Sequence, residues 1–145
     1  MTEFFVPSRP APQGSKSFKG MRKGKPVLAE SSKGVKPFRA AIAKVAALHS
    51  APLPGPVSVK LRFVMPRPVA TPKTRPTPPA VKRPDVDKLT RAVLDAIDGH
   101  AYDADSQVTH LDVRKRIAEP GEKTGVLIAW RPDRSYGLDD VAVGG

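Results

Sequence analysis

The chain has 145 residues, a length that suits one domain built around one hydrophobic core. It contains no cysteine, which excludes disulfide bonds and thiolate metal sites. Lys and Arg number 25 against 14 Asp and Glu, so the net charge is +11 at pH 7, and such a surface attracts polyanions, nucleic acid first among them.

The charge is unevenly distributed along the chain. Residues 1–84 hold 17 basic residues and only two acids, and the other 12 acids follow. We find no strongly amphipathic basic helix in the sequence, so an anionic membrane is a less favoured partner than nucleic acid. The first residues lack a basic segment followed by an apolar run, and no apolar stretch approaches the roughly 20 residues that span a bilayer. We therefore expect no membrane association and a cytoplasmic location.

The first half of the chain predicts a strand, a basic segment, a helix and a second strand. The first strand is EFFVPS, residues 3–8. Residues 9–35, rich in Pro, Gly, Ser and Lys, predict a basic loop or a hairpin, in which PVLAE could form a short strand. Apolar residues at helical spacing predict a helix over Lys36 to Ser50. Strict alternation over Val57 to Met65 predicts a half-buried strand.

Residues 66–84 contain seven prolines and five basic residues. Such a segment cannot form a helix or a central strand. It is either a linker between domains or a long loop within one domain, and the loop is favoured because neither flank is large enough for a good domain of its own. We expect this basic loop, over residues 67–83, and the basic loop over residues 9–25 to be mobile.

The second half predicts a helix and two strands. Apolar spacing predicts a helix over Val86 to Asp98, closed by Gly99. Strands are predicted over Val108 to Ile117 and Val126 to Trp130, followed by a polar tail over residues 136–145. The whole is expected to form one α/β (α+β) domain over residues 1–135. In it a mixed sheet of about four strands packs on two helices, and the three later strands are neighbours.

Six aspartates lie within residues 82–108 of this basic chain. Asp85 and Asp87 flank a single residue just before the predicted helix, so in an extended segment their side chains point to one side. A cation such as Mg²⁺, which prefers oxygen ligands, would stabilise such a pair. Helix capping is the alternative, with Asp87 as the N-cap, but capping explains one aspartate better than two.

Asp103 and Asp105 repeat the Asp-x-Asp spacing beyond the helix. Because that helix is roughly 18 Å long, the two pairs can meet only if the chain folds back after Gly99. A plain turn is the alternative explanation for the second pair.

The segment RPDVDKLTRAVLDAIDG…DADSQV resembles the signature of RusA-type Holliday junction resolvases, over about Lys82 to Arg116. That family has Asp-x-Asp-Asn before a short helix, then Asp-Asp-x-Gln-Val and a basic strand. The resemblance implies a Mg²⁺-dependent endodeoxyribonuclease, bacterial or phage-encoded. It would resolve four-way junctions by paired symmetric nicks in DNA recombination and repair, as a homodimer with no nucleotide cofactor.

The resemblance also assigns roles to residues. Asp85, Asp87 and Asp105 match the metal-binding aspartates, and we expect them to converge within about 5 Å of a common point. Arg91 lies where the family often has a catalytic lysine, and Lys88 replaces the expected Asn; either could supply the catalytic cation. Asp103 could stand in for the acid missing at position 104. The basic residues expected to contact DNA are Lys16, Lys19, Arg22, Lys23, Lys73, Arg75, Lys82 and Arg83.

Three other functions fit parts of the pattern. The first is a metal nuclease for other branched DNA, which would use the same residues. The second is a basic nucleic-acid-binding protein without catalysis, in which the acids cap helices or are solvated. The third is a ribosome-associated protein, which predicts a preference for RNA and no need for the Asp-x-Asp.

Overall fold

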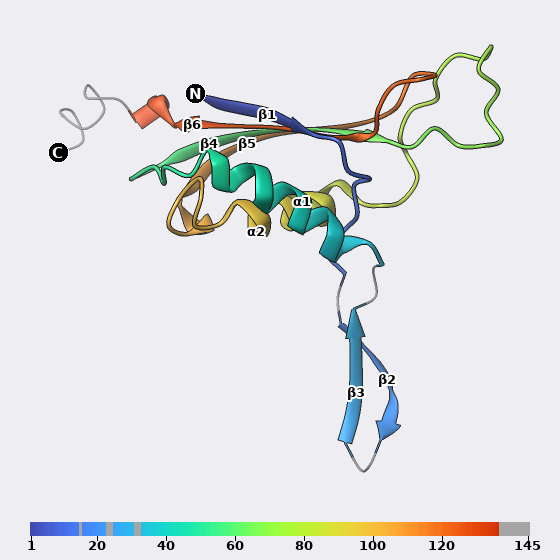
Figure 1. Cartoon of the computed structure of the whole chain (residues 1–145), viewed down its shortest axis with the longest axis horizontal. Helices are drawn as coiled ribbons and strands as arrows, with labels where there is room; N and C mark the ends of the chain where they lie inside the picture. Colours follow the sequence, from blue (N-terminus) through green and yellow to red (C-terminus); the bar gives the residue numbers. More distant parts are fainter. Residues whose placement is uncertain (15, 23–24, 31–32, 137–145) are drawn as a thin grey trace.

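A four-stranded sheet forms the body of the protein, and both helices pack on one of its faces (Figure 1). In the computed structural model its strands are β1 (Thr2–Val6), β4 (Val57–Met65), β5 (Val108–Ile117) and β6 (Gly125–Pro132). Their order is β1-β6-β4-β5. The sheet is mixed, because β4 pairs in parallel with β5, whereas β6 is antiparallel to both β4 and β1. The predicted mixed sheet of four strands on two helices is confirmed.

The central strand β4 carries the core of the sheet. Val59, Leu61 and Phe63 point to the helices and are fully buried, as the alternating pattern predicts. Lys60 and Arg62 lie on the other face and are half-buried. The three later strands are neighbours, as expected from the sequence.

Helix α1 (Val35–Leu48) begins after Gly34, whose φ of 84° is easily adopted only by glycine. Pro37 lies in its first turn, where the missing N–H has no intrahelical partner in any case. The helix buries Phe38 and Ile42 against the sheet. None of the helices formed by the described residues has both the length and the apolar character needed to cross a bilayer.

Helix α2 (Val86–Ile97) buries Leu89, Val93 and Ile97, which lie on one side of the helix. Gly99 follows with a φ of 82°, so the predicted glycine at the end of the helix is confirmed. Val86 was expected on the apolar face, but it is 41% exposed. It is the first helical residue, so no preceding helical turn lies beside it.

Residues 66–107, which include α2, connect the parallel strands β4 and β5, and a parallel pair requires such a long crossover. The proline-rich loop contains no helix or strand, as predicted. The guanidinium of Arg67 ties this loop together by donating to the Thr77 hydroxyl and to the carbonyls of Pro72 and Arg75. The mobility expected of this loop stays a prediction.

Two further strands, β2 (Lys16–Arg22) and β3 (Lys25–Glu30), pair antiparallel with each other and form a separate two-stranded sheet. Of the two alternatives for this segment, the hairpin is confirmed, so the expected basic loop over residues 9–25 includes a strand. The structure describes residues 1–14, 16–22, 25–30 and 33–136, with only the backbone given for the hairpin. Lys23 and most of the predicted polar tail lie outside the described residues.

Candidate active site

Asp85 and Asp87 lie at the start of α2, and both are exposed. Asp85 is the N-cap residue, with extended backbone dihedrals of −71° and 142°, and its side chain makes no capping hydrogen bond. Asp87 belongs to the first turn, so the alternative in which Asp87 is the N-cap is wrong. Negative charge is favourable at a helix N-terminus, but neither carboxylate is used to cap it, so both remain available to a ligand.

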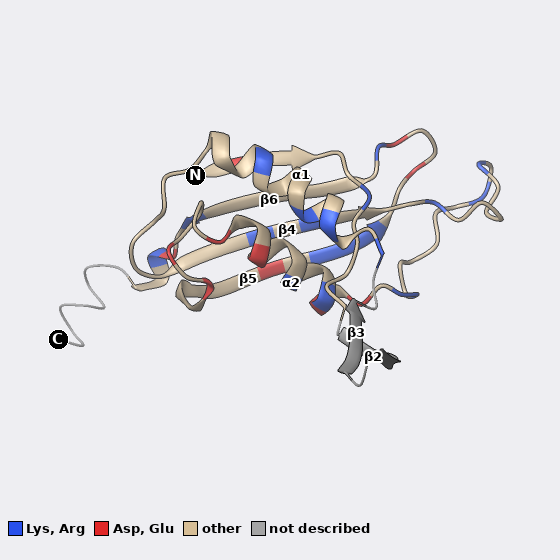
Figure 2. Ribbon diagram, turned by 60° about the horizontal axis from the view of Figure 1, so that its bottom comes forward, with Lys and Arg blue, Asp and Glu red and all other residues tan. Residues whose placement is uncertain are grey.

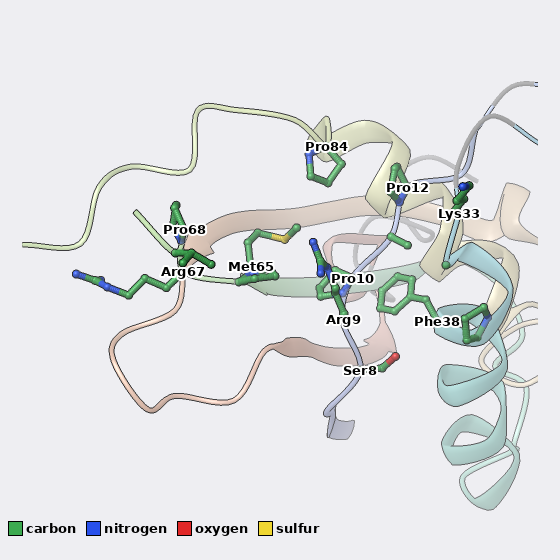
Figure 3. Close-up of a pocket in the computed structure, with 15 residues that line it drawn as sticks. Ser8, Arg9, Pro10, Pro12, Lys33, Phe38, Met65, Arg67, Pro68 and Pro84 are labelled. Carbon is green, nitrogen blue, oxygen red and sulfur yellow. The ribbon is translucent and has the colours of Figure 1, made fainter. Parts of the chain in front are cut away.

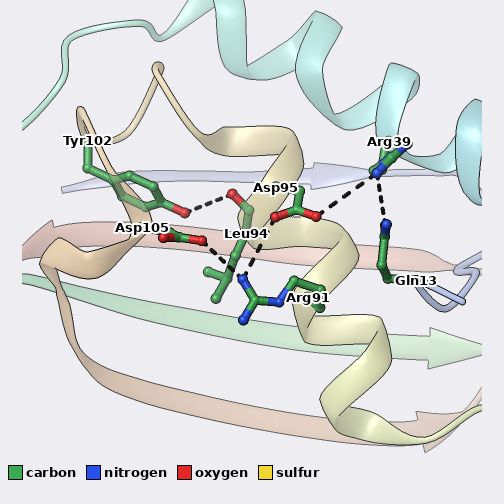
Figure 4. Close-up of polar contacts among 7 residues, drawn as sticks. All are labelled: Gln13, Arg39, Arg91, Leu94, Asp95, Tyr102 and Asp105. Atoms are coloured by element: carbon green, nitrogen blue, oxygen red, sulfur yellow. Dashed lines mark hydrogen bonds and ion pairs between the residues drawn. The ribbon is translucent and has the colours of Figure 1, made fainter. Parts of the chain in front are cut away.

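The chain folds back beside α2 after Gly99, as a shared site requires. Asp105 begins a short 3₁₀ turn that leads into β5, and its carboxylate lies 3.0 Å from the Arg91 guanidinium (Figure 4). Arg91 lies one turn after Asp87, which corresponds to about 6 Å along the helix axis. The fold therefore brings the second acidic motif to the same helix as the first.

Arg91 and Asp105 are part of a wider polar network (Figure 4). Arg91 also lies 3.9 Å from Asp95, one turn further along α2. Asp95 in turn lies 4.0 Å from Arg39 of α1, which donates to the side-chain carbonyl of Gln13. The network joins α2, α1 and the N-terminal segment, so it fixes the exposed edge of α2 against its neighbours.

Tyr102 anchors the returning chain on α2. Its buried hydroxyl donates a hydrogen bond of 2.8 Å to the carbonyl of Leu94. Burial raises the pKa of the Tyr102 phenol far above its ordinary value, and the negative charges of Asp98, Asp105 and Asp95 add to the effect. The phenol therefore stays protonated and keeps donating.

The side-chain amide of Gln107 fixes the turn that carries Asp105. Its oxygen accepts from the backbone N–H groups of Asp103 and Ala104, at 2.9 and 3.1 Å. Its nitrogen donates to the carbonyls of Leu53 and Gly55, at 2.7 and 3.0 Å. One side chain thus links the acidic turn to the segment before β4.

The sequence interpretation gave Gln107 no role of its own and did not consider Tyr102 as an anchor. Gln107 stands in the Asp-x-Asp-x-Gln pattern, so its fixed spacing from Asp105 was the available signal. Tyr102 had no such signal, because its contact depends on where the chain folds back.

The basic residues expected to contact DNA lie in two regions. Lys73, Arg75, Lys82 and Arg83 are exposed in the loop between β4 and α2. Lys16, Lys19 and Arg22 belong to strand β2, where only the backbone is described. Figure 2 shows acidic residues on α2, on β5 and in the turn before β5, while basic residues lie along β4, in the second half of β5 and in the loop after β4.

A hollow of about 940 Å³ opens next to the start of α2 (Figure 3). It is lined by residues 8–12, 33–34, 37–38, 65–69 and 84, so it lies between the N-terminal segment and the proline-rich loop. Arg9 and Arg67 are among its lining residues, and Pro84 directly precedes Asp85. The basic, partly apolar surface therefore extends to the first acidic motif.

The oxygen ligands of the three aspartates suit a hard divalent cation such as Mg²⁺. Among the residues that the structure describes, however, no three His, Asp or Glu side chains are close enough together to hold a metal ion. The expected convergence of Asp85, Asp87 and Asp105 on one point is therefore not present in this arrangement. Arg91 instead neutralises Asp105, and the assignment of the three aspartates as metal ligands stays a prediction.

A comparison with protein-family models shows which family the chain belongs to. The family model described as endodeoxyribonuclease RusA matches residues 7–129, which is most of the chain. The matched region contains α1, α2, β4, β5 and most of β6. Strand β1 lies before it, and β6 extends beyond it. No curated protein matches the chain.

Proposed function

Because the chain belongs to the RusA family of endodeoxyribonucleases, which act on branched DNA junctions, we propose that it is a Mg²⁺-dependent Holliday junction resolvase that cuts by paired symmetric nicks. The observation that carries the proposal is the position of Asp105, which contacts the same helix that bears the Asp85 and Asp87 carboxylates at its start.

In this proposal Asp85, Asp87 and Asp105 hold the divalent ion that nucleases of this family generally use. The ion, when bound, activates a water molecule and polarises the scissile phosphate. The carboxylates themselves keep it at the start of α2, beside the basic loop. Since no three acidic side chains of the described residues are close enough together to hold a metal ion, binding by all three aspartates requires them to move closer together.

Lys88 and Arg91 are the two candidates for stabilising the charge that develops on the phosphate. Arg91 already contacts Asp105, so it lies beside one proposed ligand. Lys88 is exposed in the first turn of α2, and in the part of the chain that the structure describes it forms no ion pair within 4.0 Å. Lys88 is therefore available to a phosphate, whereas one guanidinium nitrogen of Arg91 already donates to Asp105.

The basic segments that precede the acidic site in the sequence suit the backbone of a branched DNA. The exposed cations at positions 73, 75, 82 and 83 lie in the loop that leads directly into Asp85. Neutralising phosphates releases counterions, so these residues favour binding in any sequence context. We include Lys16, Lys19, Arg22 and Lys23 of the N-terminal segment in this surface.

We further propose that the protein acts as a homodimer. A four-way junction has two-fold symmetry, and paired nicks require two equivalent active sites. One chain carries one copy of the acidic motifs. A two-fold dimer supplies the second site in the symmetric position.

Membership of an endodeoxyribonuclease family argues against two of the other functions, those of a non-catalytic nucleic-acid-binding protein and of a ribosome-associated protein. A nuclease for other branched DNA, such as replication forks, remains the second candidate. It shares every residue proposed above and differs only in its preferred substrate.

The proposal is tested with end-labelled synthetic four-way junctions, three-way forks and linear duplex. We expect Mg²⁺ to support two nicks at symmetric positions of the four-way junction, EDTA to abolish them, and duplex to stay intact. Faster cutting of forks than of four-way junctions would favour the second candidate. Equal cutting of duplex and junction would contradict both.

A further inference from the structure

Lys115 of β5 contacts the backbone that leads into the first acidic motif. Its ammonium nitrogen donates to the carbonyl of Pro84 at 2.8 Å and to that of Lys82 at 3.0 Å. Both carbonyls lie within three residues of Asp85. A side chain from the edge strand of the sheet is thus tied to the segment that immediately precedes α2.

The position of Lys115 within β5 is unusual for a lysine. Because side chains alternate along a strand, Lys115 shares the helix-covered face with Val113 and Ile117, which both pack against the core. Arg114 and Arg116 point to the opposite face and are exposed. A half-buried ammonium on the packed face must be hydrogen-bonded to be tolerated, and the two loop carbonyls satisfy that requirement.

The loop also needs an external donor. Residues 66–84 contain seven prolines, which have no N–H, so the carbonyls of this loop have few backbone donors within it. Immediately after Pro84 the carbonyls find helical donors, because the Asp85 carbonyl accepts the first hydrogen bond of α2, from the Leu89 N–H at 3.1 Å. The backbone is therefore fixed on both sides of Asp85, by Lys115 before it and by the helix after it.

We propose that Lys115 is a positioning residue that sets the direction in which Asp85 and Asp87 leave the loop, so that both carboxylates face one cation. The inference rests on the proposed function, because it takes these two aspartates as metal ligands. Lys115 acts through the backbone: its ammonium group donates to the two carbonyls, and among the described residues it forms no ion pair.

The test compares Lys115→Met, which keeps an unbranched apolar stem without the donors, with Lys115→Arg, which keeps donors. Arg114→Met, on the neighbouring residue but the opposite face, is the control. We expect Lys115→Met to weaken Mg²⁺ binding, measured by calorimetry, by about tenfold, as loss of a group that orients metal ligands does. The saturated cleavage rate should stay within about threefold of wild type, Lys115→Arg should restore most of the Mg²⁺ affinity, and Arg114→Met should match wild type.

A second measurement does not depend on cleavage or on metal. In the metal-free protein, hydrogen exchange of the Leu89 amide reports the first hydrogen bond of α2. We expect this amide to exchange faster in Lys115→Met, while amides of β4 and the thermal midpoint stay close to those of wild type.

The outcomes separate the proposals. Wild-type Mg²⁺ affinity and Leu89 exchange in Lys115→Met would overturn the positioning role. So would a loss of junction affinity in EDTA at unchanged Mg²⁺ affinity, because Lys115 would then contact DNA. Faster exchange across the whole sheet would likewise overturn it in favour of a general packing role. If the wild-type protein binds no Mg²⁺, the metal assignment fails, and the exchange comparison still decides whether Lys115 orders the start of α2.

Discussion

The side-chain amide of Gln107 accepts hydrogen bonds through its oxygen and donates them through its nitrogen. Replacing the nitrogen by an oxygen therefore tests the donated bonds alone. Gln107→Glu keeps the shape and the acceptors but loses both hydrogen bonds donated to the Leu53 and Gly55 carbonyls. A carboxylate facing two carbonyl oxygens is repelled, so we expect a loss of about 2–3 kcal/mol in the free energy of unfolding, measured in urea. Cleavage should also slow, because the turn that carries Asp105 is no longer held.

Ser106→Ala is the matched control for this substitution. Ser106 is the exposed neighbour of Gln107 in the same turn, and removal of its hydroxyl should change the free energy of unfolding by less than about 0.5 kcal/mol. If Gln107→Glu were as stable as wild type, the amide could not be what connects the acidic turn to the segment before β4.

Helix α2 depends at its C-terminal end on a side chain from outside the helix. The last carbonyls of a helix lack intrahelical donors, and Tyr102 supplies one to Leu94. Tyr102→Phe keeps the buried ring and leaves that carbonyl without this donor, so we expect a destabilisation of about 1–2 kcal/mol by chemical denaturation. Tyr136→Phe, at a hydroxyl on a ring that is 57% exposed, should have no measurable effect. Equal stability of the two variants would contradict the role of Tyr102.

The main elements followed from local patterns. The alternation in β4 and the helical spacing in α2 are local properties of the chain, and these elements form where the patterns predict them. The predicted start of α2 at Val86 is confirmed, whereas the alternative with Asp87 as the N-cap is wrong, because both aspartates suit a helix start and only backbone geometry distinguishes them. The sequence itself showed the two Asp-x-Asp pairs, the resemblance assigned metal-binding roles to Asp85, Asp87 and Asp105, and the structure brings Asp105 to α2.

The contacts that hold the site could not be predicted from local patterns. Gln107 bonds to residues 52 and 54 positions away, and Lys115 to residues 31 and 33 positions away. Such pairs depend on how β4, α2 and β5 are arranged in space. Two sequence signals were available: the fixed spacing of Gln107 from Asp105, and Lys115 as a charged residue on the face that carries Val113 and Ile117.

The stability of the whole molecule should fall in acid partly through Glu122. The guanidinium of Arg116 bonds both oxygens of this carboxylate and, with the Glu119 N–H, lowers the pKa of Glu122 from 4.5 to about 2. Because the pKa of Glu122 is lower in the folded protein, the ionised carboxylate stabilises the fold at pH values above 4.5. This contribution is lost as the pH falls through about 2. Because the pair is exposed, the contribution should be only about 0.5–1 kcal/mol.

The experiment compares the free energy of unfolding of wild type and Glu122→Gln between pH 6 and pH 2. The difference between them should be largest at pH 6 and shrink as the wild-type carboxylate takes up a proton. A difference that is constant over this range would show that the ion pair does not contribute to the acid sensitivity.

The central claim is that the carboxylates at the start of α2 perform the chemistry while the basic segments bind the DNA. Its most direct test is Asp87→Asn on a synthetic four-way junction, with Asp98→Asn at the exposed far end of the same helix as the control. We predict that Asp87→Asn loses at least about 100-fold in single-turnover cleavage with Mg²⁺, since it loses a charged metal ligand. It should keep a junction Kd within about threefold of wild type, and Asp98→Asn should cut normally. Cleavage by Asp87→Asn at the wild-type rate would contradict the account.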